Sequence, residues 1–286
     1  MKNVRYMVEA LFLSLALVIF KLMPASAASA FGGWIGRTVG PCLAASRKAR
    51  INIEKSFPEK SQDEVSGILI DMWDNLGRVI AEYPHLRTLT NKYIEIRGLE
   101  NLEQTDPDKS CVYIGGHLAN WEMVHFFFNE RTDRAISFVH RKANNPYTEV
   151  LLKYCRTRAR KSVFIPKSPT GTRDLMKTVR NEGHVGIFFD QKYNQGIAAS
   201  FFGRPAMTST AFAQLARKQD APIIPIQMER IKGCRFRVTI HPPFSVTDMD
   251  DESAILFAHS LLEDWIQQHP GQWLWLHRRW DSKALQ

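Results

Sequence analysis

The sequence contains few cysteines, and their spacing argues against a disulfide-rich scaffold. The four cysteines form no C-x-x-C pair and are spread along the chain, at Cys42, Cys111, Cys155 and Cys234. A disulfide framework uses closely and regularly spaced cysteines. The cysteine content therefore favours a reducing compartment.

Common catalytic and nucleotide-binding motifs are also absent. The chain has no G-x-x-x-x-G-K-[ST], G-x-S-x-G, H-E-x-x-H or G-x-G-x-x-G sequence, which removes the usual nucleotide, hydrolase and zinc signatures. Two E-x-x-H spacings occur, Glu82 with His85 and Glu122 with His125. A di-iron site needs two such helices, and Pro84 should end the first one, so we predict no metal site.

The composition allows one substantial hydrophobic core. The chain has 286 residues, 44% of them hydrophobic and 23% charged, with no internal repeat and no low-complexity linker, as expected for one catalytic-sized domain. It carries 38 Lys and Arg against 29 Asp and Glu, a formal charge of +9. This excess favours an anionic partner such as nucleic acid, a bilayer surface or a phosphorylated ligand.

The N-terminal segment, MKNVRYMVEALFLSLALVIFKLMPASAASAFGG, has a membrane-directed pattern. Lys2 and Arg5 precede an apolar run from Met7 to Met23, and small residues follow. A signal peptide has this basic start, apolar stretch and small-residue end. A retained anchor has an apolar run near the roughly 20 residues that span hydrocarbon, and a helix resting on the bilayer has polar ends. The segment alone leaves all three interpretations open.

Beyond this segment the pattern predicts an α/β fold. Residues 31–97 are mostly helical, and Ser61 with Glu64 has capping-box spacing, which predicts a helix from about Gln62 to before Pro84. Strands and helices then alternate, which is typical of a sheet flanked by helices. The predicted strands are KYIEIRG, CVYIGG, AISFVHR, VFIP, VGIFFD, APIIPIQME and RFRVTIHPPF, and the predicted helices are PYTEVLLKYCRTRAR, TRDLMKTVRNEG and TSTAFAQLARKQ.

Chemically active residues follow several of these strands. In α/β sheets, reactive groups gather beyond the carboxyl ends of the strands. The residues at these places are His117, His140 with Arg141, and Asp190 with Gln191. We therefore expect the functional groups at one edge of the sheet.

The stretch IGGHLANWE ends a strand at two glycines and places an imidazole and a carboxylate five positions apart. Five residues turn an α-helix by about 500°, so His117 and Glu122 would not meet on one regular helix. If His117 lies in a loop and the helix begins near Asn120, Glu122 can point back to the imidazole and hold one tautomer. The glycines permit the sharp turn that this needs.

Such a pair fits general-base catalysis. No Ser, Thr or Cys lies within the motif, so the nucleophile would be a hydroxyl of the substrate, activated by a histidine that exchanges protons near neutral pH. Acyl transfer to an alcohol is one reaction of this kind. The alternative for His117 and Glu122 is a structural hydrogen-bonded pair.

The motif also resembles that of a known family. GGHLANWE is similar to the H-x4-[DE] motif of membrane-associated acyltransferases, and its GGH-x-x-NWE form resembles the lipid A biosynthesis lauroyl/myristoyl acyltransferase family. The resemblance continues from about Gly98 to Trp280, through HRKANNPYTEVLLKYCRTRARK, FFDQKYNQGIAASFFGRPAMTSTAFAQLA and QWLWLHRRW. It implies a glycerol-3-phosphate acyltransferase-like α/β sheet flanked by helices, with an N-terminal membrane helix.

The resemblance further implies an O-acyltransferase of lipopolysaccharide biosynthesis. Such enzymes move a fatty acyl chain from acyl carrier protein, or from coenzyme A, to a hydroxyl of a lipid A precursor, without a metal or organic cofactor. His117 matches the catalytic base and Glu122 its partner. Arg156 and Asp190 match the family's functional arginine and aspartate.

Several of these residues have alternative readings. Arg158 and Arg160 compete with Arg156 as the arginine that steadies an oxyanion or clamps a phosphate, and a solvated basic helix face is the structural alternative. Asn120 would cap a helix or touch substrate. Asp190 would act directly or form a salt bridge with Arg156. The other predicted binding residues are Arg141, Gly203, Arg204, Arg278 and Arg279.

Two segments supply four of these binding residues. FFGRPAMTSTAF would place Gly203 and Arg204 in a loop before a helix whose N-terminus, near Thr208, receives an anion or forms an ordinary capped turn. WLWLHRRW sets three tryptophans around Arg278 and Arg279, which suits a bilayer interface or a phosphate site. No nucleic-acid recognition fold accompanies it.

Taken with the sequence patterns, the resemblance implies that residues 1–30 are a membrane anchor and that residues 31–286 are an acyltransferase domain on the cytoplasmic face of a bacterial inner membrane. The predicted partners are acyl carrier protein, an anionic glycolipid acceptor and the inner membrane, without nucleic acid. Two alternatives stay open. One is an acyltransferase acting on a lysophospholipid or another glycolipid, and the other is a non-catalytic, membrane-tethered protein that binds lipid or phosphate.

Overall fold

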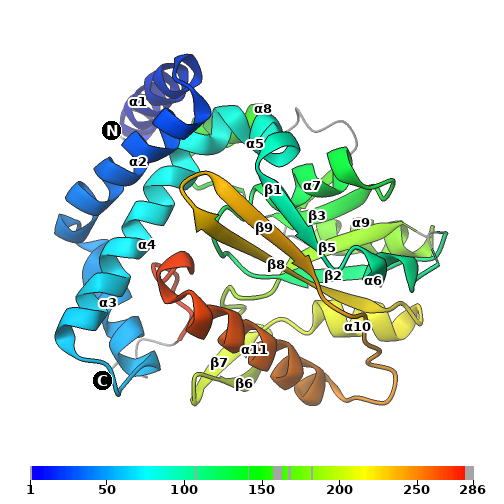
Figure 1. Ribbon diagram of the computed structural model, residues 1–286. Helices are drawn as coiled ribbons and strands as arrows, with labels where there is room; N and C mark the ends of the chain where they lie inside the picture. The colour runs from blue at the N-terminus through cyan, green and yellow to red at the C-terminus, as the bar shows by residue number, and fades with distance from the viewer. Residues whose placement is uncertain are drawn as a thin grey trace.

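The computed structural model describes residues 2–106, 108–140, 142–156, 163–166, 169–181 and 183–280. Within these ranges, helices stand beside a seven-stranded sheet and cover its two faces (Figure 1). The predicted binding residues Arg141 and Arg158, and the alternative Arg160, lie outside the described residues.

The N-terminal part is helical, as predicted. It comprises α1 (Lys2–Leu22), α2 (Ala25–Val39), the 3-10 turn η1 (Gly40–Cys42), α3 (Ala45–Ser56), α4 (Gln62–Glu82), the 3-10 turn η2 (Tyr83–His85) and α5 (Leu86–Lys92). The capping box is confirmed, because Ser61 and Glu64 bond each other's backbone N–H groups at the start of α4. Residues 3–22 are long and apolar enough to cross a membrane, by length and composition.

Small residues pack α2 against α4 at close range. A Cβ atom added at Gly32 would lie 2.5 Å from the Cβ of Ala81, and one added at Gly36 would overlap the backbone oxygen of Trp73. Only glycine allows the two helix backbones to approach so closely. The small residues after the apolar run, which fit the end of a signal peptide, thus form a helix-packing face in this fold.

The sheet is mainly parallel, and the predicted α/β fold class is confirmed. Its strand order is β1-β9-β8-β2-β5-β3-β4, and every neighbouring pair is parallel except β8 with β9. The strands are β1 (Ile94–Arg97), β2 (Val112–Gly115), β3 (Ile136–His140), β4 (Val163–Pro166), β5 (His184–Phe188), β8 (Ile223–Lys232) and β9 (Arg235–Ile240).

A separate hairpin corrects the prediction for the segment around Gly203. Strand β6 (Ile197–Phe201) pairs antiparallel with β7 (Arg204–Thr208). The turn between them is Phe202 and Gly203, with φ values of 49° and 67°, as a two-residue hairpin turn of type I′ requires. Gly203 is therefore in a turn as predicted, but Arg204 starts a strand rather than continuing a loop.

The remaining helices pack two apolar clusters against the sheet. They are α6 (Glu100–Glu103), α7 (Met123–Arg131), α8 (Pro146–Arg156), α9 (Pro169–Arg180), α10 (Ala211–Lys218), α11 (Asp251–Gln268) and the turn η3 (Pro270–Gln272). Strand β2 is buried throughout. Its Val112 and Ile114 join the cluster that includes α10 and α11, while Tyr113 joins the cluster that includes α5 and α7. The strand that leads to His117 is thus fixed from both faces.

Candidate active site

The carboxyl ends of β2 and β5 bring two predicted residues together. The strands are parallel neighbours, with Gly115 paired to Phe188 at their ends. His117 and Asp190 each follow two residues later and lie at the same edge of the sheet. The loop position predicted for His117 is confirmed, although the regular helix, α7, begins only at Met123.

His117 is hydrogen-bonded to Asp190. Its Nδ1 lies 2.7 Å from Oδ1 of Asp190, and its backbone N–H donates to Oδ2 at 2.8 Å. The indole N–H of Trp273 donates to the same Oδ2 at 2.9 Å. Asp190 is completely buried, and these N–H groups replace the water that its charge would otherwise need.

The electrostatics of this contact fix the tautomer of His117. Burial alone would raise the pKa of Asp190, but the adjacent imidazole and the hydrogen bonds from His117 hold it below the usual range of an aspartate. An ionised carboxylate only accepts hydrogen bonds, so Nδ1 carries the proton and Nε2 is left as the acceptor. The amide nitrogen of Gln191 lies 3.3 Å from this Nε2, and the His117 side chain keeps 14% of its surface exposed.

The segment after α11 holds the motif loop in place. Leu118 pairs with Trp273 in an isolated antiparallel bridge, and Leu274 donates its backbone N–H to the carbonyl of His117 at 3.2 Å. This segment therefore acts as a structural clamp. The predicted bilayer contact of its tryptophans is wrong, because all three are packed in the core: Trp273, Trp275 and Trp280.

The motif loop is strained and tightly packed. Ala119 has a φ of 48°, a left-handed value that persists only where surrounding contacts enforce it. Its N–H donates to Gln272 at 2.9 Å and its carbonyl accepts from Asn75 at 3.0 Å. At Gly116 an added Cβ would lie 2.7 Å from a methyl group of Leu262 and 3.4 Å from Oδ2 of Asp190, so this glycine is needed for close packing beside the acid.

Glu122 belongs to a second cluster, and its predicted contact with the imidazole is wrong. Its carboxylate accepts from Nε of Arg156 at 2.8 Å, from Nη2 of Arg156 at 2.5 Å and from the hydroxyl of Tyr83 at 2.8 Å. Because α7 begins only after Glu122, no helical turn aims this side chain at His117. The alternative of an Asp190–Arg156 salt bridge is also wrong, since Arg156 pairs with Glu122.

This second cluster keeps its charges. Burial would raise the pKa of Glu122, but the charge and hydrogen bonds of Arg156 hold it at about 2. The same pairing raises the pKa of Arg156 above its ordinary value in spite of burial. The role of Tyr83 in this cluster was not predicted. The only indication in the sequence is its position directly before Pro84, at the end of a predicted helix.

The end of α4 anchors the motif a second time, through Asn120. This residue is fully buried and donates to Glu82 at 2.7 Å, and Glu82 is also bound by Arg230 of β8, Nη2 to Oε2 3.0 Å. The predicted helix cap is wrong, because the N-cap residue of α7 is Glu122, without a side-chain cap bond. The consecutive residues Glu82 and Tyr83 thus position Asn120 and Glu122.

The two arginines predicted to bind a ligand near the C-terminus differ in burial. Arg278 is exposed, and Arg279 is completely buried. Arg279 donates to the backbone of Met207 at 2.9 Å and to the hydroxyl of Thr208 at 2.7 Å. Burial lowers its pKa to about 10, although the charge of Asp190 acts in the opposite direction. Arg279 therefore supports the core beside Asp190 and is not exposed to a ligand in this structure.

Arg204 and Gly203 lie on the hairpin. The guanidinium carbon of Arg204 stands 3.6 Å from the ring centroid of Trp280, and one nitrogen donates to Ser56 of α3 at 2.8 Å. Its Nε and Nη1 are buried, with no hydrogen-bond partner among the described residues, and burial lowers its pKa to about 10. Gly203 is exposed in the turn.

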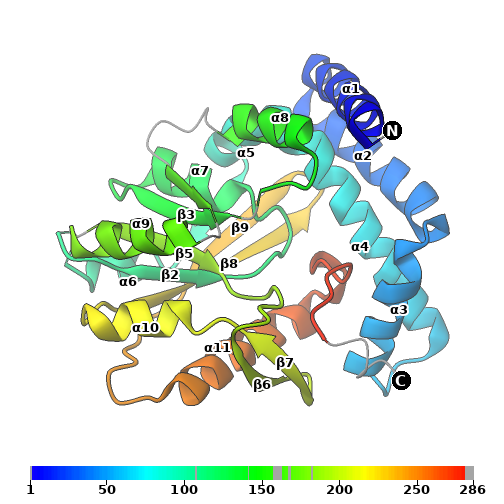
Figure 2. The ribbon, with the colours of Figure 1, turned by 180° about the vertical axis from the view of Figure 1, so that it is seen from behind.

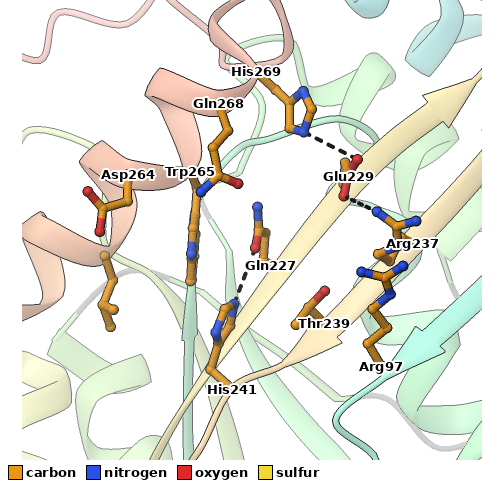
Figure 3. Close-up of a pocket in the computed structure, with 11 residues that line it drawn as sticks. Arg97, Gln227, Glu229, Arg237, Thr239, His241, Asp264, Trp265, Gln268 and His269 are labelled. Carbon is orange, nitrogen blue, oxygen red and sulfur yellow. Dashed lines mark hydrogen bonds and ion pairs between the residues drawn. The ribbon is translucent and has the colours of Figure 1, made fainter.

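A polar pocket lies elsewhere, between α11 and the strands β8 and β9 (Figure 3). Its volume is about 440 Å³, and no predicted site residue of the described part of the chain lines it. Inside it, Glu229 forms an ion pair with Arg237 at 3.0 Å and lies 3.2 Å from Nε2 of His269. Within the described ranges, no group of three or more His, Cys, Asp or Glu side chains is placed to hold a metal ion.

The fold and the site define a class of enzyme. A mainly parallel sheet presents a histidine whose Nδ1 is held by a buried acid and whose Nε2 can accept a proton. No Ser, Thr or Cys lies within the motif. Arg156 is hydrogen-bonded to Glu122 of the motif. A histidine held in this way is suited to general-base chemistry on a hydroxyl, as an acyltransferase requires.

The chain belongs to the bacterial lipid A biosynthesis acyltransferase family, which it matches over residues 1–282. It is 27% identical over 251 residues to a lipid A biosynthesis acyltransferase of Haemophilus influenzae, covering 82% of this chain and 77% of the relative. It is 24% identical over 259 residues to the lipid A biosynthesis lauroyltransferase of Escherichia coli, covering 83% and 80%. The palmitoleoyltransferase of the same organism is 23% identical over 250 residues, covering 83% and 79%. The predicted family and enzyme class are confirmed.

Proposed function

We propose that this lipid A acyltransferase takes its acyl group from acyl carrier protein, or from coenzyme A, and uses His117 as general base. The observation that carries the proposal is the 2.7 Å contact of Nδ1 with the buried Asp190. It leaves Nε2 as the atom that can accept the acceptor's hydroxyl proton. Family membership supports a lipid A precursor as the acceptor.

The proposed reaction proceeds in two steps. Nε2 of His117 takes the proton of the acceptor hydroxyl while its oxygen attacks the thioester carbonyl carbon, which gives a tetrahedral oxyanion. The oxyanion then collapses, the carbon–sulfur bond breaks, and the carrier thiolate leaves with the proton from Nε2. The negative charge of Asp190 stabilises the imidazolium between these steps. The products are the ester and the free carrier thiol.

The second cluster has a supporting role in this proposal. Arg156 stabilises the oxyanion or binds a phosphate of the acceptor, and Glu122 positions it through a two-point contact. Glu122 thereby acts on the arginine rather than on the base. On the hairpin, Arg204 retains two unpaired donors among the described residues and, with the exposed Arg278, remains a candidate for binding acceptor phosphate.

The proposed location is the cytoplasmic face of the inner membrane. The apolar α1 supports a membrane anchor, and the relatives act in lipid A biosynthesis by their names. In this arrangement the acyl carrier protein approaches from the cytoplasm and the acceptor from the lipid.

An acyl-transfer assay with a labelled donor and two alternative acceptors tests this function. Membranes containing the protein are incubated with acyl carrier protein that carries a labelled fatty acyl chain as a thioester, and with either a tetra-acyl glucosamine disaccharide or lysophosphatidic acid. We expect transfer to the disaccharide, and a loss of at least about a hundredfold in rate for His117→Ala, because a general base typically contributes that much or more.

The outcomes separate the alternatives. Transfer only to the lysolipid would establish the phospholipid reaction instead. Full activity of His117→Ala would refute the assignment of the base. If the protein bound the acceptor but transferred no acyl chain from any donor, the alternative of a non-catalytic lipid- or phosphate-binding protein would be favoured. Mass spectrometry of lipid A made with and without the protein identifies the acyl group that is added.

A further inference from the structure

Helix α1 is tied to the domain at both of its ends. Near its N-terminal end, the side chain of Asn145, directly before α8, donates to the backbone oxygen of Tyr6 at 2.9 Å. Near its C-terminal end, Nε2 of His85 in η2 lies 2.8 Å from the backbone oxygen of Phe20. The helix therefore lies along the domain and does not project from it (Figures 1 and 2).

The outer face of α1 is apolar. Ala10, Leu17 and Phe20 are buried and form one stripe at helical spacing. The exposed apolar residues lie on the side of the helix away from this stripe: Val4, Met7, Val8, Leu11, Phe12, Leu15, Val18, Ile19 and Leu22. A patch of this kind marks an interaction with a protein or a membrane.

Two neighbouring helices extend this apolar surface. Helix α1 contacts both α8 and α2. On α8, Tyr147, Val150 and Tyr154 are exposed by 44%, 67% and 61% and share one helix face. On α2, Trp34 is exposed by 51%, next to the exposed Phe31 and Ile35. Tyr and Trp are the residues that favour the headgroup level of a bilayer.

The ties at both ends exclude a simple transmembrane orientation. Helix α1 is about 30 Å long, close to the thickness of the hydrocarbon layer. If it crossed the bilayer, its two docking points on the domain would lie at opposite membrane surfaces. The exposed Lys142 and Asn144 beside one end and Arg87 beside the other would then require the domain between them to be immersed in lipid. Irregular polar backbone is not tolerated there.

We propose that α1 lies in the plane of the membrane, within one leaflet, and that the exposed faces of α1, α2 and α8 together form the lipid-docking surface. This inference rests on the membrane location in the proposed function. The occupant of the surface is a lipid leaflet. Lys21 at the C-terminal end of α1 suits its anionic headgroups, whereas Arg5 near the other end is paired with Glu9 at 2.9 Å.

The docking surface is continuous with the second cluster of the site. Helix α8 ends at Arg156, and η2 begins with Tyr83. These two residues hold Glu122. In the proposed orientation both elements rest on the leaflet, so an acceptor lipid in that leaflet reaches the site without crossing the membrane.

The sidedness of the two termini tests the orientation. The full chain carries one epitope tag at each end and is expressed in a Gram-negative host. We expect both tags to be protected from protease in spheroplasts and both to be cut in inverted vesicles. Cleavage of the N-terminal tag alone in spheroplasts would show that α1 spans the bilayer and would overturn the inference. Cleavage of both tags in spheroplasts would support the in-plane helix but contradict the cytoplasmic location.

Charged substitutions test the docking surface. In flotation with vesicles of phosphatidylethanolamine and phosphatidylglycerol, the double variant Trp34→Glu with Val150→Glu should bind at least about tenfold more weakly, because charges are unfavourable in apolar lipid. The control is Leu256→Glu on α11, a residue exposed by 40% on a helix distant from α1 in Figure 1, and it should bind as wild type does. Equal binding of the double variant and wild type would overturn the inference.

An activity measurement keeps this inference separate from the proposed function. Wild type and Leu256→Glu are assayed in detergent micelles with the disaccharide and lysophosphatidic acid. Transfer to the disaccharide is expected from both. If neither acceptor were acylated, the proposed function would fail, and the flotation and protease results would still decide the orientation of α1.

Discussion

At the scale of single residues, the proposed mechanism depends on which acid holds the imidazole of His117. The H-x4-[DE] spacing suggests Glu122, yet His117 is held by Asp190, 73 positions away in sequence. Glu122 instead pairs with Arg156. One short motif therefore contributes to two clusters, a histidine with its acid and an arginine with its acid, and their proposed roles can be separated by substitution.

We expect Asp190→Asn to abolish the base while retaining the shape of the site. Oδ2 of Asp190 receives the N–H groups of His117 and Trp273, so an asparagine would place its oxygen there and turn its NH2 group toward Nδ1. Nδ1 would then become the acceptor and Nε2 would carry the proton, which is the wrong tautomer for a base. The rate constant kcat should fall by about 10³ to 10⁴, with little change in KM.

Two comparison variants make this result specific. Asp174→Asn on α9, an exposed acid, should have wild-type kcat. Glu122→Gln should disturb the Arg156 cluster and so raise KM or lower kcat without changing the tautomer of His117, which nitrogen NMR of the imidazole can report. Wild-type kcat in Asp190→Asn, or a tautomer change in Glu122→Gln but not in Asp190→Asn, would contradict the assignment.

At the scale of elements, the glycines between α2 and α4 determine how the N-terminal helices support the site. An added Cβ at Gly36 would overlap the backbone of Trp73 in α4. Gly36→Ala must therefore push the helices apart, and we expect the free energy of unfolding to fall by about 1–3 kcal/mol, the usual range for overpacking. Chemical denaturation followed by circular dichroism measures the change.

A second glycine of α4 supplies the matched control. At Gly67 an added Cβ meets no atom within 4 Å, so Gly67→Ala should stabilise the helix by about 0.5–1 kcal/mol, since alanine favours a helix over glycine. We expect the free energy of unfolding to fall in Gly36→Ala and to rise in Gly67→Ala. Equal effects would show that α2 and α4 do not pack in this way.

Elements with strong local signals could be predicted from the sequence. The capping box gave the start of α4, and the predicted strands correspond to seven strands of the sheet. The β6–β7 hairpin escaped prediction because Phe202, rather than the usual Asn or Asp, occupies the first turn position. Helix α11 was also not predicted, although Asp250 caps it by accepting a hydrogen bond from the N–H of Ser253 at 2.7 Å.

The candidate site could be predicted only in part. The positions of His117 and Asp190 after parallel strands follow from local pattern and a general rule of α/β sheets. Their pairing depends on β2 and β5 being neighbours, which no local signal encodes. The contacts of Tyr83 and Trp273 depend on how α4 and the C-terminal segment fold back onto the motif, so they required the structure.

At the scale of the whole molecule, several buried groups respond to acid in the same direction. Burial lowers the pKa of His125 to about 4, of His184, together with the charge of Arg134, to about 4, and of His259, together with the charge of Arg279, to about 3. The pKa of Glu122 is also low, at about 2, and that of Asp190 lies below its usual range. In each case the unfolded chain binds a proton more readily than the folded protein does.

We therefore expect the folded protein to lose stability continuously as the pH falls. Each of these groups has a lower pKa folded than unfolded, so its contribution is complete above the unfolded value and declines as pH falls towards the folded value. The loss begins below about pH 6.5, where unfolded histidines charge, and steepens below about pH 4.5, where unfolded carboxylates become protonated. Denaturant midpoints at pH 7, 5, 4 and 3 in one detergent measure it. In the Glu122→Gln variant, the fall of the denaturant midpoint below about pH 4.5 should become shallower. A wild-type midpoint that stayed constant from pH 7 to 3 would contradict the buried-charge arrangement.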